Sequence, residues 1–209
     1  MKVTPMIFNT EMVKALLSGR KTVTRRPIKR IGEFNFVVEN GQTKERYVTD
    51  ENNPHQKWLK FPINIDDLIY VRETFRIFNH SDECGCSEHC YCPPTGTPIY
   101  FATHDDGESK WNPSIHMPRW ASRLTLRVTD VRIERVKEIT DEQARAEGCW
   151  YGVGGGEVDL AVPPQDHFPT LWDSIYQNWD ENPYVWVIEF EAIHQNVDKV
   201  VSEMGDVCQ

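Results

Sequence analysis

The chain has 209 residues and a formal net charge of −9, and its apolar and charged fractions of 39% and 26% allow an ordinary globular core. The negative charge argues against a protein that coats duplex DNA, because that function needs a broad basic surface. No apolar run is long enough to cross a membrane, and polar residues interrupt the N-terminal segment where a signal peptide needs an apolar core, so we expect a cytoplasmic protein.

The N-terminal residues predict a strand, a helix and then a basic loop. Residues 1–8 form the expected strand, Asn9 or Thr10 can cap the helix, and Gly19 can end it in the left-handed conformation. The basic stretch GRKTVTRR at residues 19–26 therefore follows the end of a helix.

A polar segment and several strands follow. Residues 31–60 carry turn signals and predict either a small hairpin or a mobile excursion. The segments 63–75 and 97–102 each contain a predicted strand. The clearest strand is RLTLRVTDVRIERV at 123–136, whose apolar alternation slips by one residue near Asp130, as in a β-bulge.

The C-terminal third predicts two helices and a closing strand. Thr140 and Gln143 have the spacing of a capping box at the start of the first helix. Residues 169–179 predict a second, amphipathic helix, and residues 184–193 predict the closing strand. The polar tail at 196–209 is expected to be flexible.

These elements predict one α+β domain over residues 1–195, built on a curved β-sheet or small barrel with short flanking helices. The segments 31–60 and 76–120 are expected insertions into that domain. The sequence shows no internal repeat and no clean linker between domains.

Four cysteines lie close together in the second insertion. Cys84, Cys86, Cys90 and Cys92 form the pattern C-x-C-x3-C-x-C, and His89 lies in the same segment, so its participation is left open. Four thiolates satisfy tetrahedral zinc in number and type, and a site filled by protein ligands is structural rather than catalytic. The alternative is a cysteine-rich loop that holds no ion stably. We expect structural zinc and no cofactor for catalysis.

The basic loop contains residue types that support nucleophilic chemistry. Lys21 and Thr24 are three residues apart, and the like charges of Arg25 and Arg26 favour the neutral form of a nearby lysine. A threonine hydroxyl beside such a base can act as a nucleophile. The alternative is an exposed basic turn with no chemistry.

The loop also resembles a known family. Gly19-x-Lys21 followed by Arg26, after a short helix, is similar to the signature loop of ASCH domains, which resemble PUA-type RNA-binding barrels. The later strands and the helix at 140–148 fall in the family's order, and HMPRWASR resembles a long, phage- or prophage-encoded branch of ASCH-like proteins. The resemblance implies a PUA-like β-barrel.

Within that family, the loop is most similar to the loop of small bacterial N4-acetylcytidine amidohydrolases. The resemblance implies Lys21 as general base, Thr24 as nucleophile, and Glu147, late in a T-x-x-x-A-x-x-E helix, as the acid. It implies removal of an acyl group from the exocyclic amine of N4-acetylcytidine or a related modified nucleoside. Arg26 or a backbone N–H would stabilise the oxyanion.

The loop at 111–123 supplies further candidates for substrate binding. Trp120 can stack on a base while Arg119 contacts phosphate or a base edge. The alternative is that the tryptophans are core residues and the arginines are solvated. The expected substrate-binding residues are Gly19, Arg26, Arg72, His116, Arg119 and Trp120.

Functions of different classes remain open. The first is the amidohydrolase, and the second is a non-catalytic module that binds RNA or a modified nucleotide through the same pocket. A ribonuclease is a third. The set of Lys21, Thr24 and Glu147 favours hydrolysis, whereas the acidity of the chain disfavours a long polynucleotide track.

Overall fold

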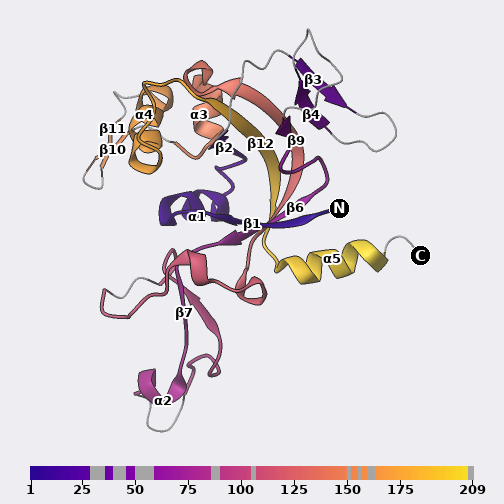
Figure 1. Cartoon of the computed structure of the whole chain (residues 1–209). Coiled ribbons are helices and arrows are strands. Elements are labelled where there is room, and N and C mark those ends of the chain that lie inside the picture. Colours follow the sequence, from indigo (N-terminus) through magenta and orange to yellow (C-terminus); the bar gives the residue numbers. More distant parts are fainter. Residues whose placement is uncertain are drawn as a thin grey trace. The chain divides into compact units, whose positions relative to one another are not determined.

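A computed structural model of the chain confirms a mixed α+β fold and describes residues 1–28, 36–39, 46–49, 59–85, 90–104, 107–149, 152–154, 157–159 and 163–206. Five strands pair in the order β1 (Val3–Ile7), β6 (Leu68–Arg72), β9 (Thr125–Arg135), β12 (Tyr184–Ile193) and β2 (Val23–Pro27) (Figure 1). Among these residues no pairing joins β1 to β2, so the predicted barrel is not confirmed.

Smaller sheets and short helices complete the described elements. The helices are α1 (Thr10–Leu17), α2 (His80–Glu83), α3 (Asp141–Ala146), α4 (Pro164–Ile175) and α5 (Val197–Asp206), with 3-10 turns at Ser114–His116, Arg119–Ala121 and Val136–Glu138. The smaller sheets pair β3 (Phe36–Glu39) with β4 (Arg46–Thr49) and β5 (Leu59–Lys60), β7 (Phe75–Ile77) with β8 (Pro98–Tyr100), and β10 (Gly152–Gly154) with β11 (Glu157–Asp159). The β3–β4 pairing is the hairpin predicted within 31–60. No helix in the described ranges combines the length and the apolar character that a membrane crossing requires.

The chain divides into two compact units, where the sequence predicted one domain over residues 1–195. Unit 1 contains Met1–Lys2, Arg20–Leu68 and Arg127–Glu191. Unit 2 contains Val3–Gly19, Ile69–Leu126 and Ala192–Gln209.

In unit 1, α3 and α4 lie side by side and share one apolar core with β2 and β12 (Figure 1). Val185 and Val187 are fully buried in this core because alternate residues of a strand share a face. Ala144 of α3 and Trp172 of α4 pack in the same cluster. The capping box predicted at Thr140 is present, so α3 begins where the sequence indicated.

Unit 2 contains the N-terminal helix and the β7–β8 hairpin. Asn9 caps α1 by accepting a hydrogen bond from the Met12 N–H at 2.9 Å, as predicted. Phe75 and Met117 form a small buried cluster near the hairpin. Tyr100 packs against this cluster. These contacts join the hairpin to the loop at 111–123.

The C-terminal tail differs from the prediction. Residues 196–209 were expected to be flexible, but α5 occupies most of this segment, and Val197 and Val200 are buried. The reason is visible in the sequence, since the apolar residues Val197, Val200, Val201 and Met204 recur at helical spacing within a polar segment. The prediction considered the average polarity of the tail and missed its one apolar helix face.

Candidate functional site

The basic loop GRKTVTRR leads from α1 into β2. Gly19 has a φ of +72°, in the left-handed region that glycine tolerates, and its N–H donates to the Leu16 oxygen at 3.0 Å. The glycine therefore ends α1 as the sequence predicted, and the backbone conformation accounts for its presence.

Two of the three predicted catalytic residues, Lys21 and Glu147, are in direct contact. Lys21 Nζ donates to Glu147 Oε2 at 2.7 Å and to the backbone oxygen of the same residue at 2.8 Å. The two side chains are buried, with exposed fractions of 0% and 3%. Since 126 positions separate them in the sequence, the topology of the chain makes this contact.

Backbone hydrogen bonds of Thr22 fix the loop in this position. The Thr22 N–H donates to the Ala146 oxygen at 2.8 Å, and the Thr22 oxygen accepts from the Phe190 N–H at 2.9 Å. Glu147 is the C-cap residue of α3, so the ammonium of Lys21 also lies beside carbonyl groups at the helix end, which favour a cation. The loop is thereby held between α3 and β12.

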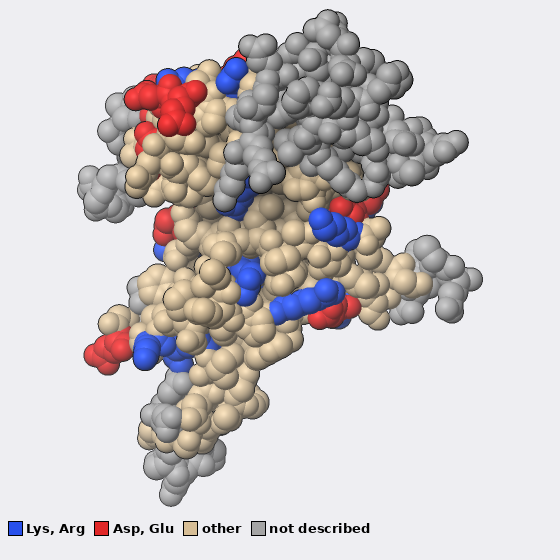
Figure 2. All heavy atoms as spheres, viewed as in Figure 1, with Lys and Arg blue, Asp and Glu red and all other residues tan. Residues whose placement is uncertain are grey.

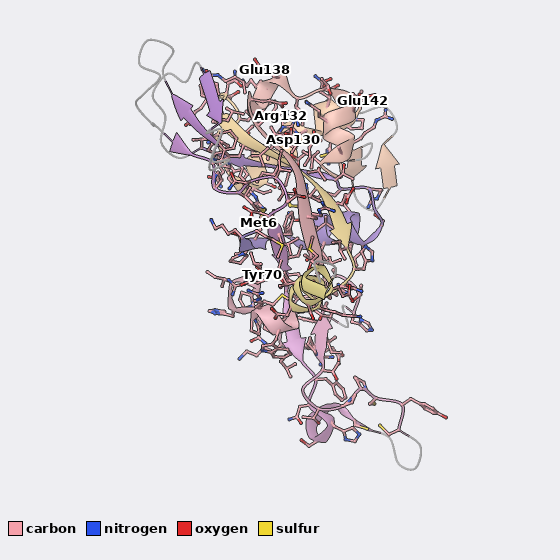
Figure 3. All side chains as sticks on the ribbon, turned by 90° about the vertical axis from the view of Figure 1, so that its right-hand side faces the viewer. Met6, Tyr70, Asp130, Arg132, Glu138 and Glu142 are labelled. Atoms are coloured by element: carbon pink, nitrogen blue, oxygen red, sulfur yellow. The ribbon has the colours of Figure 1, made fainter. Side chains whose placement is uncertain are left out.

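Arg25 extends the pair into a network of charges. Arg25 Nη1 donates to Glu147 Oε1 at 3.2 Å, and its Nη2 donates to Glu134 Oε2 at 3.0 Å. Arg132 on β9 (Figure 3) holds Glu134 in turn, with 2.5 Å between Nε and Oε1. Arg25 Nε is buried with no hydrogen-bond partner among the described residues. This nitrogen is a spare donor on a side chain that contacts Glu147.

Burial controls protonation at this site. It lowers the pKa of Lys21 below the ordinary 10.5 against the attraction of Glu147, and Arg26 lowers it further. The sequence predicted this direction from the neighbouring arginines, but burial is the larger cause. Burial, with Glu147 nearby, raises the pKa of Cys149 to about 12, so this thiol stays protonated at neutral pH.

Thr24, the third predicted catalytic residue, lies on β2 beside Arg25. Successive side chains of a strand point to opposite faces, so Thr24 faces away from the side on which Arg25 contacts Glu147. In the described part of the chain, no hydrogen bond joins the Thr24 hydroxyl to Lys21 or Glu147. The structure therefore brings together the predicted base and acid, and it does not bring the predicted nucleophile to them.

Arg26 and Arg72, both predicted to bind substrate, are engaged by protein groups. Arg26 Nη1 donates to the Tyr176 hydroxyl at 3.0 Å. Arg72 Nε donates to the Met117 oxygen at 2.8 Å, and its Nη2 donates to the Ile115 oxygen. Arg72 thus braces the backbone of the loop at 111–123.

The three candidates on that loop, His116, Arg119 and Trp120, are exposed. Arg119 forms an ion pair of 2.6 Å with Asp198, and Asn196 Nδ2 donates to the backbone oxygen of Trp120 at 3.1 Å. Trp120 is 58% exposed, so the alternative of a core residue is wrong for this tryptophan. Asn196 Nδ2 also donates to the backbone oxygens of Arg119 and Ser122, so the backbone that carries this exposed ring is held in place, which suits stacking.

A separate group of metal-ligating side chains lies between β7 and β8. His80, Cys84 and Cys90 each offer one donor atom within 4.8 Å of the others, so this group could hold a metal ion. Cys84 and Cys90 were predicted as ligands, and His80 was not. Cys92 is not part of the group. Two predicted or possible ligands, Cys86 and His89, lie outside the described residues.

Comparisons with known proteins give no assignment, because no family model, curated protein or solved structure matches the chain significantly. The resemblance to ASCH domains therefore rests on the sequence motifs.

Sequence analysis missed three residues of these groups. Arg25 was considered only as a like charge near Lys21 but is 3% exposed, and Glu134 was treated only as part of a strand. His80 precedes Cys84 by four residues, the spacing of one helical turn, and this signal could have identified it.

The ion pairs of Glu134 predict a change in acid stability. Burial favours a raised pKa for Glu134, but hydrogen bonds and charge from Arg132 and Arg25 outweigh it and hold the pKa below its ordinary 4.5. A carboxylate with a lowered folded-state pKa stabilises the fold above pH 4.5, and this contribution is lost as the pH falls through the lowered value. In Glu134→Gln, the free energy of unfolding is therefore expected to fall less steeply than in the wild type as the pH is lowered below 4.5.

Urea unfolding at a series of pH values measures the effect. Glu142→Gln, at an exposed position of α3, is the control and should leave the wild-type pH dependence in place. An unchanged acid dependence in Glu134→Gln would contradict this prediction.

Proposed function

We propose that this chain is an ASCH-type amidohydrolase that removes an acyl group from the exocyclic amine of N4-acetylcytidine or a related modified nucleoside. One observation carries the proposal. The two residues that the resemblance implies as base and acid, Lys21 and Glu147, form a buried contact of 2.7 Å. Burial lowers the pKa of Lys21, and a buried titratable group with a shifted pKa in contact with a carboxyl group is a candidate for proton transfer. The proposed fold is the family's PUA-like barrel, supported by the order of the strands and helices along the chain.

The pair shares a proton that either group can carry. In one form Lys21 is an ammonium and Glu147 a carboxylate, and in the other they are an amine and a carboxylic acid. Burial favours the amine form of Lys21, against the attraction of the Glu147 carboxylate. A transfer between Nζ and Oε2, 2.7 Å apart, converts one form into the other.

The proposed acylation step starts from the neutral form. The Thr24 oxygen attacks the carbonyl carbon of the acetamide, and its proton passes to the Lys21 amine. The C–N bond breaks as Glu147 gives its proton to the exocyclic nitrogen, so cytidine leaves and the acetyl group stays on Thr24. The role of Thr24 rests on the sequence resemblance. The oxyanion is assigned to Arg26, whose side chain alternates onto the same face of β2 as Thr24, or to a backbone N–H.

Hydrolysis of the acetyl ester restores the starting state. The Glu147 carboxylate takes a proton from the attacking water, and Lys21 returns its proton to the Thr24 oxygen as acetic acid is released. The sum is amide plus water giving amine plus carboxylic acid. The proposed reaction uses no metal or cofactor, and zinc is proposed only as a structural ion.

Glu147→Gln tests the proposal directly. The glutamine keeps the size of the side chain but cannot supply a proton, so we expect release of cytidine from N4-acetylcytidine to fall by about 10²–10⁴-fold. Liquid chromatography measures the product, with the free nucleoside and acetylated RNA as substrates.

Glu142→Gln, an exposed carboxylate on the same helix (Figure 3), is the matched control and should keep wild-type activity. Circular dichroism confirms that each variant is folded. No turnover by the wild type, or full turnover by folded Glu147→Gln, would refute the hydrolase.

A second candidate function is binding of RNA or a nucleotide without chemistry, and the exposed Trp120 favours it. In unit 2, Arg76 and Lys110 also line an open hollow of about 470 Å³ that suits an anionic group. In the face shown in Figure 2, the visible basic side chains form small groups, and several of these groups lie beside acidic side chains. Binding of N4-acetylcytidine without turnover, detected by calorimetry, would favour this candidate.

A further inference from the structure

The metal-ligating group lies on an extension of the β7–β8 hairpin. Beyond the paired strands, the Phe78 N–H donates to the Thr97 oxygen and the Gly96 N–H donates to the Phe78 oxygen, both at 2.9 Å. A turn over Pro94–Thr97 places Gly96 at φ +94°, a conformation that favours glycine at the third position of a turn. The two chains at the base of the extension are therefore fixed to each other.

Helix α2 places two donors on one side. Asn79 caps it by accepting from the Ser81 N–H at 3.3 Å, and the Cys84 N–H donates to the His80 oxygen at 3.1 Å, which closes one turn. Residues four apart lie on the same helix face, so the imidazole and the first thiol are neighbours. Cys90 comes from the returning chain, after the intervening segment.

The three donor atoms already lie near coordination distance. His80 Nε2 is 3.2 Å from Cys90 Sγ, and Cys84 Sγ is 3.3 Å from Cys90 Sγ. Sulfur ligands of a tetrahedral zinc ion lie about 3.8 Å apart, since each Zn–S bond is about 2.3 Å. Shifts of a few tenths of an ångström would accommodate the ion.

The position of the His80 ring is also fixed. The backbone N–H of His80 donates to Thr95 Oγ1 at 3.1 Å. The imidazole ring packs edge-on against the buried Phe78 ring, with 6.4 Å between the ring centroids. The sulfur atoms beside α2 stand at the end of the hairpin extension (Figure 3). The set therefore combines a held imidazole with two thiols that solvent can reach.

We propose that His80, Cys84 and Cys90 bind one Zn²⁺ ion, which ties α2 to the returning chain of the β7–β8 hairpin. Two thiolates and an imidazole select zinc over the oxygen-preferring ions Mg²⁺ and Ca²⁺. A tetrahedral ion takes its fourth ligand from outside this group. The proposal adds His80 to the ligands. It gives the ion a structural role, because the ion would connect α2 to the returning chain at Cys90, beyond the hydrogen bonds at the base of the hairpin extension.

Cobalt binding to the full-length protein tests this ligand set. Zinc is measured in protein purified without chelators, where about one ion per chain is expected, and then replaced by Co²⁺, whose absorption reports thiolate and imidazole ligands. Cys84→Ser, Cys90→Ser and His80→Ala are each expected to weaken Zn²⁺ binding by at least about 100-fold. His104→Ala, at another exposed histidine of unit 2, is the control and should bind as the wild type does.

The variant His80→Cys tests whether residue 80 coordinates the metal ion or only lies beside the site. If His80 coordinates the ion, this variant still binds Co²⁺ and its thiolate-to-cobalt absorption rises. Wild-type affinity in His80→Ala, or no rise in His80→Cys, would remove His80 from the site. A Cys84–Cys90 disulfide with no bound zinc in the purified protein would overturn the proposal. None of these measurements depends on hydrolase activity.

Discussion

Replacing Glu147 with leucine is expected to lower the free energy of unfolding by about 3–5 kcal/mol, because the change leaves the ammonium of Lys21 buried without its carboxylate. Lys21 has no exposed surface, and its only carboxylate contact is Glu147 among the described residues. Arg25 loses one of its two carboxylate partners in the same change and keeps Glu134. Urea unfolding followed by circular dichroism measures the loss.

A double-mutant cycle isolates the pair. Lys21→Met leaves the Glu147 carboxylate with Arg25 as its partner, so it should cost less than Glu147→Leu. The combined variant should recover much of the stability, since replacing a buried ion pair by apolar groups of similar size is often close to neutral. Glu142→Leu, at an exposed site of the same helix, should stay within about 0.5 kcal/mol of the wild type. A loss in the combined variant equal to the sum of the two single losses would show that Lys21 and Glu147 are not coupled.

The pH dependence of these variants follows from the lowered pKa of Lys21. Between that lowered value and 10.5, the unfolded chain binds more protons than the folded one at this residue, so its contribution to stability rises with pH. Without the Glu147 carboxylate, which raises the pKa, the window should widen toward lower pH. The rise should disappear in Lys21→Met.

Local signals in the sequence were sufficient for much of the fold. The closing strand was predicted at 184–193 and is observed as β12 with the same bounds. On β9, Val128 and Val131 are both buried, which is the predicted change of alternation near Asp130. These features depend on periodicity and capping within a few residues, which a single sequence displays.

Contacts between distant segments could not be predicted in the same way. The sequence pointed to Lys21 and Glu147 through a family resemblance, but it could not show that Arg25 joins them, because an arginine in a basic stretch is usually solvated. His80 was missed for a related reason, since the cysteine pattern alone already satisfied the expected ligand count. The face of Thr24 depends on the start of β2, and a shift of one residue would reverse it.

Thr24→Val is expected to reduce the rate of hydrolysis by at least about 10³-fold and to leave the free energy of unfolding nearly unchanged. Valine has almost the shape of threonine and suits a strand. The buried hydroxyls of Ser122 and Thr125 donate to backbone oxygens at 3.0 Å and 2.8 Å, whereas the Thr24 hydroxyl makes no such bond within the described residues. Its removal therefore breaks no hydrogen bond within the described residues.

Thr125→Val provides the opposite control, because its hydroxyl is bonded to the Gln195 oxygen. This variant should lose about 1–3 kcal/mol of stability and keep its turnover of N4-acetylcytidine once it is folded. Thermal unfolding and product release are measured on both variants in parallel. If Thr24→Val instead turns over at the wild-type rate, the threonine is not the nucleophile. Water must then attack the amide directly beside Lys21 and Glu147, which fits the position of Thr24 on the other face of β2.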